Sequence, residues 1–417
     1  MGTIQRNKEV SRLERRELTF DILKGFAILE VISHHTLGLA ARRYVEEGSF
    51  GWWLILLLNR TLHFAVPTFL LVSALLLARS LAKKDQLDWA YFLKRRFWRT
   101  GYPYLVWTAI YLALRGGVPE IGLGATLVWG KGHYHLYFLA VLLEVSLLFP
   151  LIFLAIRRWR PSLPLTLAVA AGVQVGVYVS NYYLRYLPYP GSSALFYLFP
   201  VILGVWLGVH WEDWRPVWVR YRYRLVQWGT AAFGLYMIAE VCLLVRVPVG
   251  EFPYFWLFRI GPAALLLYAT AAGLLLIRVS EDVAEHSRMR AVLAQIGDRS
   301  LGLFLIHPLF LYLIQGPKVT AFLNRLPIPA LWAIALVFLL SWIAVEATQR
   351  AGLSRWLYGR EFLPLGAYSR RVATVRGMRR RRSTLPARPG TPRFHPTAAS
   401  VTTRSPLPLP PQPSSRK

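Results

Sequence analysis

The sequence predicts an all-α, polytopic membrane protein of about ten transmembrane helices, with both termini in the cytoplasm. Of its 417 residues, 55% are hydrophobic and only 17% are charged, whereas a soluble domain carries roughly 25% charged residues. Apolar runs of about 18 to 25 residues recur along the chain, and roughly 20 apolar helical residues cross a bilayer core. The net charge of +28 is spread unevenly over the connections, and this asymmetry predicts the orientation.

Ten segments have the length and composition of spanning helices. They lie at roughly 20–40, 54–79, 97–114, 134–156, 163–180, 193–210, 225–245, 255–277, 300–316 and 328–349. The first is expected to be a retained helix rather than a signal peptide, because it contains Asp21, Lys24 and Glu30 and no small-residue cleavage site follows it. The stretch 119–130 is too short to cross and is expected to be an extracytoplasmic or interfacial segment.

Connections with many lysines and arginines alternate along the chain with connections that have few. One set holds 38 of them, in segments 1–19, 79–99, 157–162, 211–224 and 278–299 and in the tail from 350, whereas the intervening connections hold 8. The positive-inside rule places the rich set in the cytoplasm, and we expect the protein in the inner (plasma) membrane. Because this rule accounts for most of the positive charge, nucleic acid is not an expected partner. The single cysteine, Cys242, excludes an internal disulfide.

Three parts follow from these patterns. Residues 1–19 are a cytoplasmic N-terminal segment, 20–350 form the transmembrane domain, and 351–417 form a basic tail rich in Pro, Ser and Arg. Such a composition buries too little apolar surface to fold, so the tail is predicted to be largely disordered. It either anchors to anionic lipids or only reinforces the topology, and the composition favours the second interpretation.

The first predicted helix contains the largest group of ionisable side chains: Asp21, Lys24, Glu30, His34 and His35. Such groups are costly inside a membrane and are candidates for function. Lys24 and His35 are eleven residues apart, which places them on one face about 16 Å apart along the axis. Asp21 is expected to pair with Lys24, and Glu30 to hydrogen-bond His34. The His35 imidazole can act as a general base toward a hydroxyl, or it can be a histidine of ordinary helix packing.

The third predicted helix follows a run of basic residues. Arg96 and Arg99 are three apart and share a face, whereas Arg95 is expected to point elsewhere. Two guanidiniums on one face at the cytoplasmic interface suit a phosphate or pyrophosphate. Basic residues at this position are also ordinary topology signals.

Two further predicted helices contain histidines. His133 and His135 are two apart and would face different ways on a helix, so metal ligation is not expected. His307 precedes Pro308, and a proline at mid-membrane is tolerated where a cavity is lined. The sequence has no Walker loop, dinucleotide fingerprint, zinc spacing or serine elbow. No metal and no bound cofactor are therefore expected.

Four segments in order resemble the acyltransferase-3 family, which O-acetylates surface carbohydrates in bacterial membranes. They are Asp21-x-x-Lys24-Gly-x-Ala27 followed by His35, Val66-Pro67-Thr-Phe69-Leu-Leu-Val-Ser73, Arg96-x-x-Arg99 followed by Pro103, and Ser300-Leu-Gly302-Leu-Phe304-Leu305-Ile-His307-Pro308. The resemblance runs from about 17 to 350. Ala74 stands where the family usually has Gly, and Leu301 and Phe304 stand where it has Tyr.

The resemblance implies a donor, an acceptor and roles for the site residues. The donor is acyl-CoA in the cytoplasm, usually acetyl-CoA, and the acceptor is a hydroxyl of a cell-surface or lipid-linked carbohydrate. Arg96 and Arg99 would bind the CoA phosphates, and His35 would be the general base or a transient acyl carrier. Asp21, Lys24 and His307 would support this face. The identity of the acceptor, the acyl group and the oligomeric state stay open.

A transporter or flippase of a lipid-linked sugar or polysaccharide is the alternative. It explains ten spans and buried charges equally well, with membrane lipids as its surroundings. It does not explain why a basic pair on the donor side accompanies a buried histidine. Acyl-CoA hydrolysis by the purified protein separates the two hypotheses.

Overall fold

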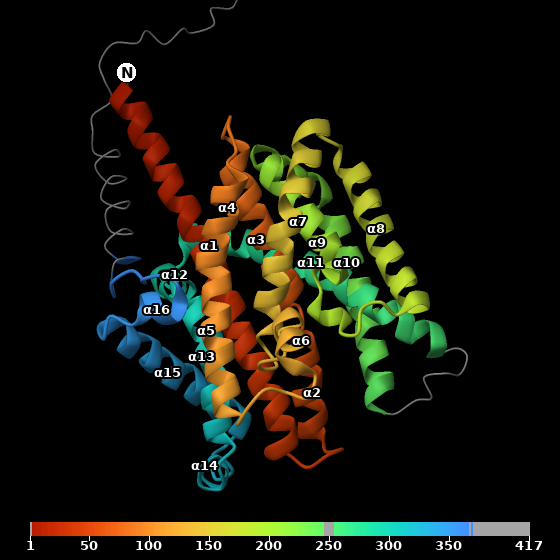
Figure 1. Cartoon of the computed structure of the whole chain (residues 1–417), viewed down its shortest axis with the longest axis vertical. Coiled ribbons are helices and arrows are strands. Elements are labelled where there is room, and N and C mark those ends of the chain that lie inside the picture. The colour runs from red at the N-terminus through yellow and green to blue at the C-terminus, as the bar shows by residue number, and fades with distance from the viewer. Residues whose placement is uncertain (1, 246–253, 367, 370–417) are drawn as a thin grey trace, which may run out of the picture. The chain divides into compact units, whose positions relative to one another are not determined.

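The computed structural model describes residues 2–245, 254–366 and 368–369, and every regular element in this part of the chain is a helix (Figure 1). The α-helices are α1 (Gly2–Arg43), α2 (Phe50–Thr61), α3 (Ala65–Ala82), α4 (Trp89–Arg96), α5 (Tyr102–Leu114), α6 (Gly122–Val128), α7 (Tyr137–Trp159), α8 (Leu163–Leu184), α9 (Leu198–Val209), α10 (Trp214–Leu244), α11 (Tyr254–His286), α12 (Arg290–Asp298), α13 (Ser300–Ile314), α14 (Pro317–Leu323), α15 (Pro329–Arg350) and α16 (Ser354–Tyr358). Short π and 3-10 turns are η1 (Phe97–Gly101), η2 (Pro190–Ser192), η3 (Ala194–Tyr197) and η4 (Trp211–Asp213). The all-α prediction is confirmed.

Within the described residues, six helices are long and apolar enough to cross a membrane, or seven if α12 and α13, bent by 74°, count as one span. These seven correspond to seven of the predicted spans. The other three, 20–40, 97–114 and 193–210, are helical in α1, η1–α5 and α9. However, α5 and α9 are short, and α1 carries charged side chains in its interior. The membrane class is therefore confirmed, and the number of ten spans stays a prediction.

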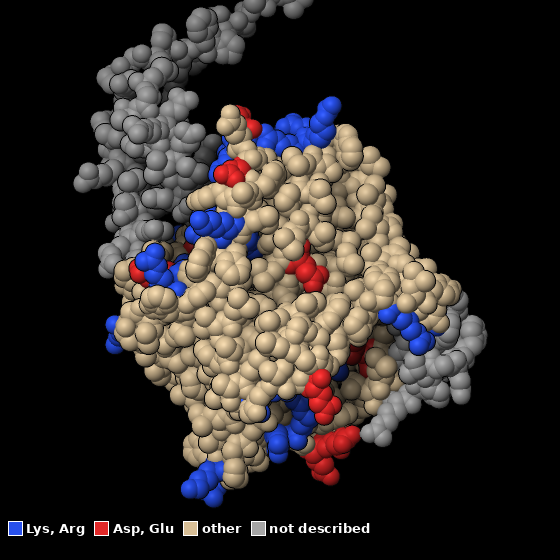
Figure 2. Space-filling model, in the orientation of Figure 1, with Lys and Arg blue, Asp and Glu red and all other residues tan. Residues whose placement is uncertain are grey.

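The surface of the helices suits lipid. Large apolar side chains such as Leu147 and Leu151 on α7 and Val175 on α8 are more than half exposed. Figure 2 shows a mostly uncharged face, with the charged side chains concentrated toward its two ends. A soluble protein rarely exposes contiguous apolar surface on this scale. These exposed apolar side chains therefore fit the hydrocarbon core of a membrane.

Glycines allow the closest helix contacts. On α9, a Cβ at Gly204 or Gly208 would run into the backbone of α3, as in the small-residue interfaces of membrane helices. On α1, a Cβ at Gly25 would run into the carbonyl of Leu293 in α12. This contact holds α1, with Lys24 on its face, directly against α12.

The first part of the predicted tail packs onto the bundle. Tyr358, Phe362 and Tyr368 are buried, and the indole of Trp107 donates to the carbonyl of Leu357 at 2.9 Å. The boundary predicted at 351 is thus too early, because aromatic side chains beyond it bury apolar surface. The disorder predicted for the rest of the tail concerns 370–417, which lies outside the described residues.

The order of the helices agrees with alternating connections. Figure 1 places the α3–α4 and α7–α8 connections at the end where α1 begins, and α14 at the opposite end. We expect reporter fusions after residues 88, 160, 217 and 285 to report a cytoplasmic location, and fusions after residues 47 and 187 an extracytoplasmic one. Paired enzymatic reporters active on opposite sides of the membrane measure this. A cytoplasmic signal after residue 187 would contradict the orientation.

Candidate active site

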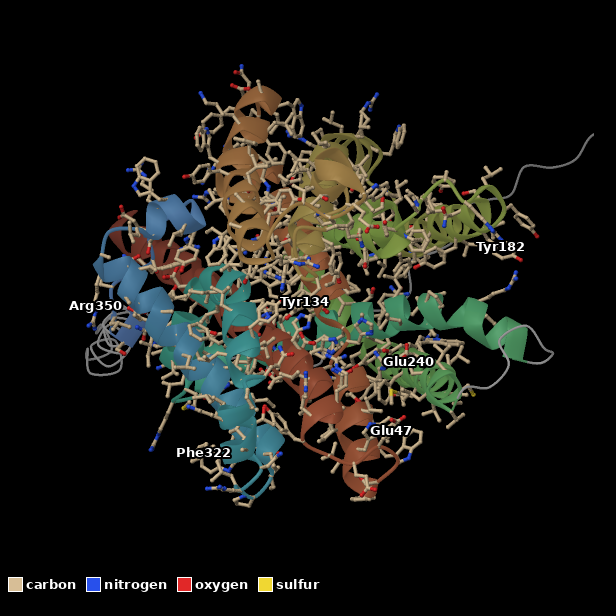
Figure 3. All side chains as sticks on the ribbon, turned by 60° about the horizontal axis from the view of Figure 1, so that its bottom comes forward. Glu47, Tyr134, Tyr182, Glu240, Phe322 and Arg350 are labelled. Carbon is tan, nitrogen blue, oxygen red and sulfur yellow. The ribbon has the colours of Figure 1, made fainter. Side chains whose placement is uncertain are left out.

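His35 lies where side chains from three parts of the chain meet. Its ring stacks on His307 of α13, with centroids 5.4 Å apart, and contacts the edge of Tyr134 at 4.9 Å. Figure 3 shows Tyr134 near the middle of the view, with Glu47, Tyr182, Phe322 and Arg350 around the periphery. Within the described residues, neither ring nitrogen of His35 takes part in a hydrogen bond. Ring contacts with neighbouring side chains thus orient the imidazole, and both of its nitrogens are without a hydrogen bond to the described residues.

His34 is bonded differently from its neighbour. Its Nδ1 lies 2.9 Å from the carbonyl oxygen of Asn59, and the Asn59 amide donates to the His34 carbonyl at 2.6 Å. The predicted bond from Glu30 to His34 is wrong. Both carboxylate oxygens of Glu30 are buried, and neither has a hydrogen-bond partner among the described residues. Asn59 bonds His34 instead, because α2 packs against this stretch of α1.

His34 and His35 belong to a continuous group of six histidines, here called the histidine cluster. Successive ring centroids are 5.0 to 5.7 Å apart along the group. In order of contact its members are His63, His34, His35, His307, His135 and His133. Helices α1 and α13 and two connections supply it, so distant segments converge on His35. No three of the described His, Cys, Asp and Glu side chains are arranged to hold a metal ion.

His63, His133 and His135 are members of the cluster that the sequence analysis did not assign to the site, and the last two were expected to face different ways. That analysis placed the fourth helix from 134, where residues two apart face different ways. The helix begins only at Tyr137, and the residues before it form a connection of turns. This backbone directs both rings to one side, with their Nδ1 atoms 2.9 Å apart. The only signal in the sequence was two further histidines in a chain that has nine.

His307 contacts the ring of His35 from α13. It is fully buried, and its Nδ1 lies 3.1 Å from the carbonyl oxygen of Leu303, one turn earlier. Its Nε2 is buried and has no hydrogen-bond partner among the described residues. The His307 ring stacks on the His35 ring with an angle of 19° between their planes. The supporting role of His307 stays a prediction.

The predicted ion pair at the other end of the α1 stripe is present. Lys24 Nζ lies 2.6 Å from Asp21 Oδ1. The other oxygen, Oδ2, accepts a hydrogen bond from the Tyr368 hydroxyl at 2.5 Å. Asp21 therefore fixes Lys24 and also ties α1 to a residue almost at the end of the described chain. Helix α1 is continuous from Gly2 to Arg43, so the spacing of about 16 Å between Lys24 and His35 holds.

A cavity, here called the arginine cavity, lies at the α3–α4 connection. It has a volume of about 440 Å³, and its lining includes Arg96 and Arg99. Arg95, expected to point elsewhere, also lines it, with Lys84 and Tyr91. Within the described residues, no carboxylate pairs with any of the three guanidiniums.

The local backbone explains the geometry of the arginine cavity. The chain leaves α4 through the π-helix η1, in which Tyr102 N–H donates to the carbonyl of Phe97. Pro103 lies just beyond and has no N–H to continue a regular ladder, and π-turns are frequent at functional sites. This wider turn changes the angles between side chains. Arg95 lies before this turn, in the regular helix α4, and it is four residues from Arg99, a spacing that also puts two side chains on one face. The expectation that Arg95 points elsewhere was therefore wrong.

Arg96 is the most enclosed of the three arginines. Its Nε donates to Ser146 Oγ of α7 at 3.0 Å, and one terminal nitrogen is buried with no partner among the described residues. Burial, together with the Arg99 and Arg95 charges, lowers the pKa of Arg96 to about 10. It thus remains a cation at neutral pH. Asp88 also lines the cavity but pairs with none of the three guanidiniums, and like charges without a paired carboxylate favour an anionic ligand.

A buried ion network, which the sequence analysis did not predict, holds the bend between α12 and α13. Arg299 is 1% exposed and pairs with Glu346 of α15 and with Asp298. Its second terminal nitrogen donates to the carbonyl of Leu363 at 2.8 Å. Asp298 also pairs with Arg360. Because α13 begins at this bend and carries His307, the network anchors the helix that supplies this one histidine of the cluster.

Comparison with known proteins gives one match. The model of a protein family described as an acyltransferase domain matches residues 17–346. The matched range includes the ion pair on α1, His35, the arginine cavity and His307. No curated protein and no solved structure matches the chain.

Proposed function

Because the chain belongs to the acyltransferase-3 family, we propose that it transfers an acyl group from cytoplasmic acyl-CoA to a hydroxyl of a cell-surface or lipid-linked carbohydrate. Acetyl is the expected acyl group, and the inner (plasma) membrane is the expected location. The observation that carries the donor assignment is the arginine cavity, with three guanidiniums that lack carboxylate partners within the described residues.

The donor fits the charge and the rings of the arginine cavity. Coenzyme A carries a pyrophosphate and a ribose phosphate, and arginine binds such groups through two parallel hydrogen bonds. Arg95, Arg96 and Arg99 supply the charge, and the Tyr91 ring is 59% exposed at the cavity and available for an adenine to stack on. The cavity lies beside 79–99, a segment that the positive-inside rule assigns to the cytoplasm, where acyl-CoA is found.

The acyl transfer requires one proton to leave the acceptor hydroxyl. In the proposed reaction, a ring nitrogen of His35 takes this proton while the hydroxyl oxygen bonds to the thioester carbonyl carbon. The carbon–sulfur bond then breaks, the ester is released, and the thiolate takes up a proton as coenzyme A leaves. A route in which His35 carries the acyl group transiently would have the same reactants and products. Both routes need the free imidazole nitrogens described above.

The first test is acyl transfer by the purified protein in lipid nanodiscs. We expect label from acetyl-CoA to appear in an added cell-envelope glycan fraction, with slow acetyl-CoA hydrolysis in its absence. Mass spectrometry of surface glycans from a deletion strain identifies the acceptor. Movement of a lipid-linked sugar across the bilayer without any acyl transfer would favour a flippase instead.

Arg96→Gln and Arg99→Gln are expected to raise the KM for acyl-CoA roughly tenfold to a hundredfold, since a hydrogen bond to a charged group contributes about 1.5–3 kcal/mol. Arg95→Gln should act in the same direction, because Arg95 shares the cavity. Lysine replacements should restore little, since lysine lacks the planar fork. Initial rates against acetyl-CoA concentration provide the measurement.

Lys94→Gln is the matched control for the arginine variants. Lys94 is an exposed cation on the same helix, next to Arg95, and it does not line the cavity. It should leave the KM for acyl-CoA unchanged. An equal rise in KM for Lys94→Gln would show a general effect of surface charge and remove the argument for a phosphate site.

A further inference from the structure

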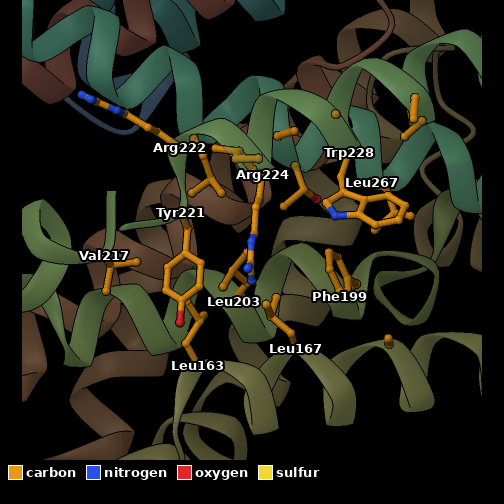
Figure 4. Close-up of a pocket in the computed structure, with 18 of the residues that line it drawn as sticks. Leu163, Leu167, Phe199, Leu203, Val217, Tyr221, Arg222, Arg224, Trp228 and Leu267 are labelled. Carbon is orange, nitrogen blue, oxygen red and sulfur yellow. The ribbon is translucent and has the colours of Figure 1, made fainter. Parts of the chain in front are cut away.

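A second cavity, here called the lateral groove, opens between helices α8, α9, α10 and α11, away from the residues discussed so far. Its volume is about 710 Å³, and its lining is almost wholly apolar (Figure 4). None of its lining residues belongs to the histidine cluster or the arginine cavity. Both α8 and α10 bury few of their residues in the protein. The lateral groove therefore opens toward the surrounding lipid.

One cation extends into this apolar space. Figure 4 shows Arg224 reaching from α10 into the lateral groove, between Tyr221 and Trp228, whereas Arg222, which also lines the groove, extends its guanidinium in another direction. Arg222 is bonded elsewhere, since it donates to the Tyr223 hydroxyl at 3.2 Å and lies over that ring. Arg224 has no carboxylate or hydrogen-bond partner among the described residues. It is available for an anion at the edge of a hydrocarbon-lined surface.

The position of Arg224 along α10 matches a lipid phosphate. Arg224 ends the segment 211–224, which the positive-inside rule assigns to the cytoplasmic side. The lining on α10 continues eleven residues further, to Leu235, which is about 16 Å of helix. Half of a bilayer core of roughly 30 Å is about the same length. The apolar part beyond Arg224 therefore has the length of the chains of one leaflet.

We propose that the lateral groove binds an anionic phospholipid of the cytoplasmic leaflet, with its phosphate on Arg224 and an acyl chain along α8 and α10. Charge complementarity selects the anionic head, because the charged side chains of the described lining are Arg222 and Arg224, and the Arg224 guanidinium has no partner among the described residues. The lipid carrier of an acceptor sugar is not the occupant, because its reactive hydroxyl would have to lie at the histidine cluster. This lipid site is independent of the proposed acyl transfer.

Native mass spectrometry of the full-length protein released from detergent tests the site. The probes are phosphatidylglycerol and phosphatidylcholine of the same chain length, titrated in competition. The unmodified protein should retain one phosphatidylglycerol in preference to phosphatidylcholine. Arg224→Gln should reduce this preference about fivefold, since one basic residue near an anionic lipid contributes about 1 kcal/mol. Arg222→Gln should keep it, because the Arg222 guanidinium is bonded to Tyr223 although its side chain also lines the groove.

Two further variants test the groove itself. Ala171 on α8 and Ala231 on α10 are exposed in its lining, so Ala171→Phe and Ala231→Phe should fill it and lower retention of both lipids. The proposal is overturned if Arg224→Gln keeps the full preference, or if Arg222→Gln loses as much. It is also overturned if Ala171→Phe and Ala231→Phe both leave lipid retention unchanged. A polyprenyl phosphate that displaces bound phosphatidylglycerol at a lower concentration than added phosphatidylglycerol does would overturn it as well.

Discussion

His35→Ala is expected to lower the rate of acyl transfer roughly 10²- to 10⁴-fold, the usual contribution of a positioned proton-transfer group. The ring has two nitrogens without hydrogen bonds to the described residues, and contacts with His307 and Tyr134 hold it in place. Alanine removes the proton acceptor and leaves the helix α1 intact. The measurement is transfer of labelled acetyl into a glycan fraction, divided by the amount of protein in the membrane.

His34→Ala is the matched control, because it sits at the same depth on the same helix. His34 is bonded to Asn59, so its loss should weaken the packing of α1 on α2 and reduce the amount of protein. Activity per molecule should stay within a few-fold of the unmodified protein. Equal losses of activity per molecule in the two variants would contradict the separate roles of His34 and His35. Full activity in His35→Ala would favour the flippase hypothesis.

Local spacing predicted the parts of the site that lie on one uninterrupted helix. The Asp21–Lys24 ion pair and the interval from Lys24 to His35 follow from 3.6 residues per turn. They survive because α1 is regular over its whole length. The expectation for Arg95 was wrong because it rested on the three-residue spacing of Arg96 and Arg99 alone, although Arg95 is four residues from Arg99 and such pairs also share a face. Helical periodicity thus predicts which side chains share a face only when both the three-residue and the four-residue spacings are considered.

Contacts between distant segments were beyond the reach of the sequence. Asp21 and Tyr368 are hydrogen-bonded across 347 residues, and no periodicity relates them. Asn59 took the place expected for Glu30 because α2 packs on α1 there. His133 and His135 entered the site through a connection of turns, for which helical spacing has no meaning. Most of the histidine cluster is therefore a product of tertiary structure.

Arg299→Ala is expected to lower the free energy of unfolding by about 3–5 kcal/mol, the usual cost of removing one partner of a buried ion pair. The change would leave Glu346 buried without its cation and remove the bond to the Leu363 carbonyl. Lysine should restore little, because the planar fork of arginine serves Glu346, Asp298 and that carbonyl together. Thermal unfolding in detergent, followed by the fraction of monodisperse protein, measures the loss.

Arg278→Ala is the matched control for Arg299. Arg278 also pairs with two carboxylates, Glu281 and Asp282, but it is 35% exposed, and exposed pairs contribute about 0–1 kcal/mol. Its replacement should change the unfolding temperature little, whereas Arg299→Ala should cause a decrease in unfolding temperature that is many times larger. A similar, small change for both variants would contradict the view that the Arg299 network fixes the α12–α13 bend. Such a result would mean that α13, and with it His307, keeps its position without these ion pairs.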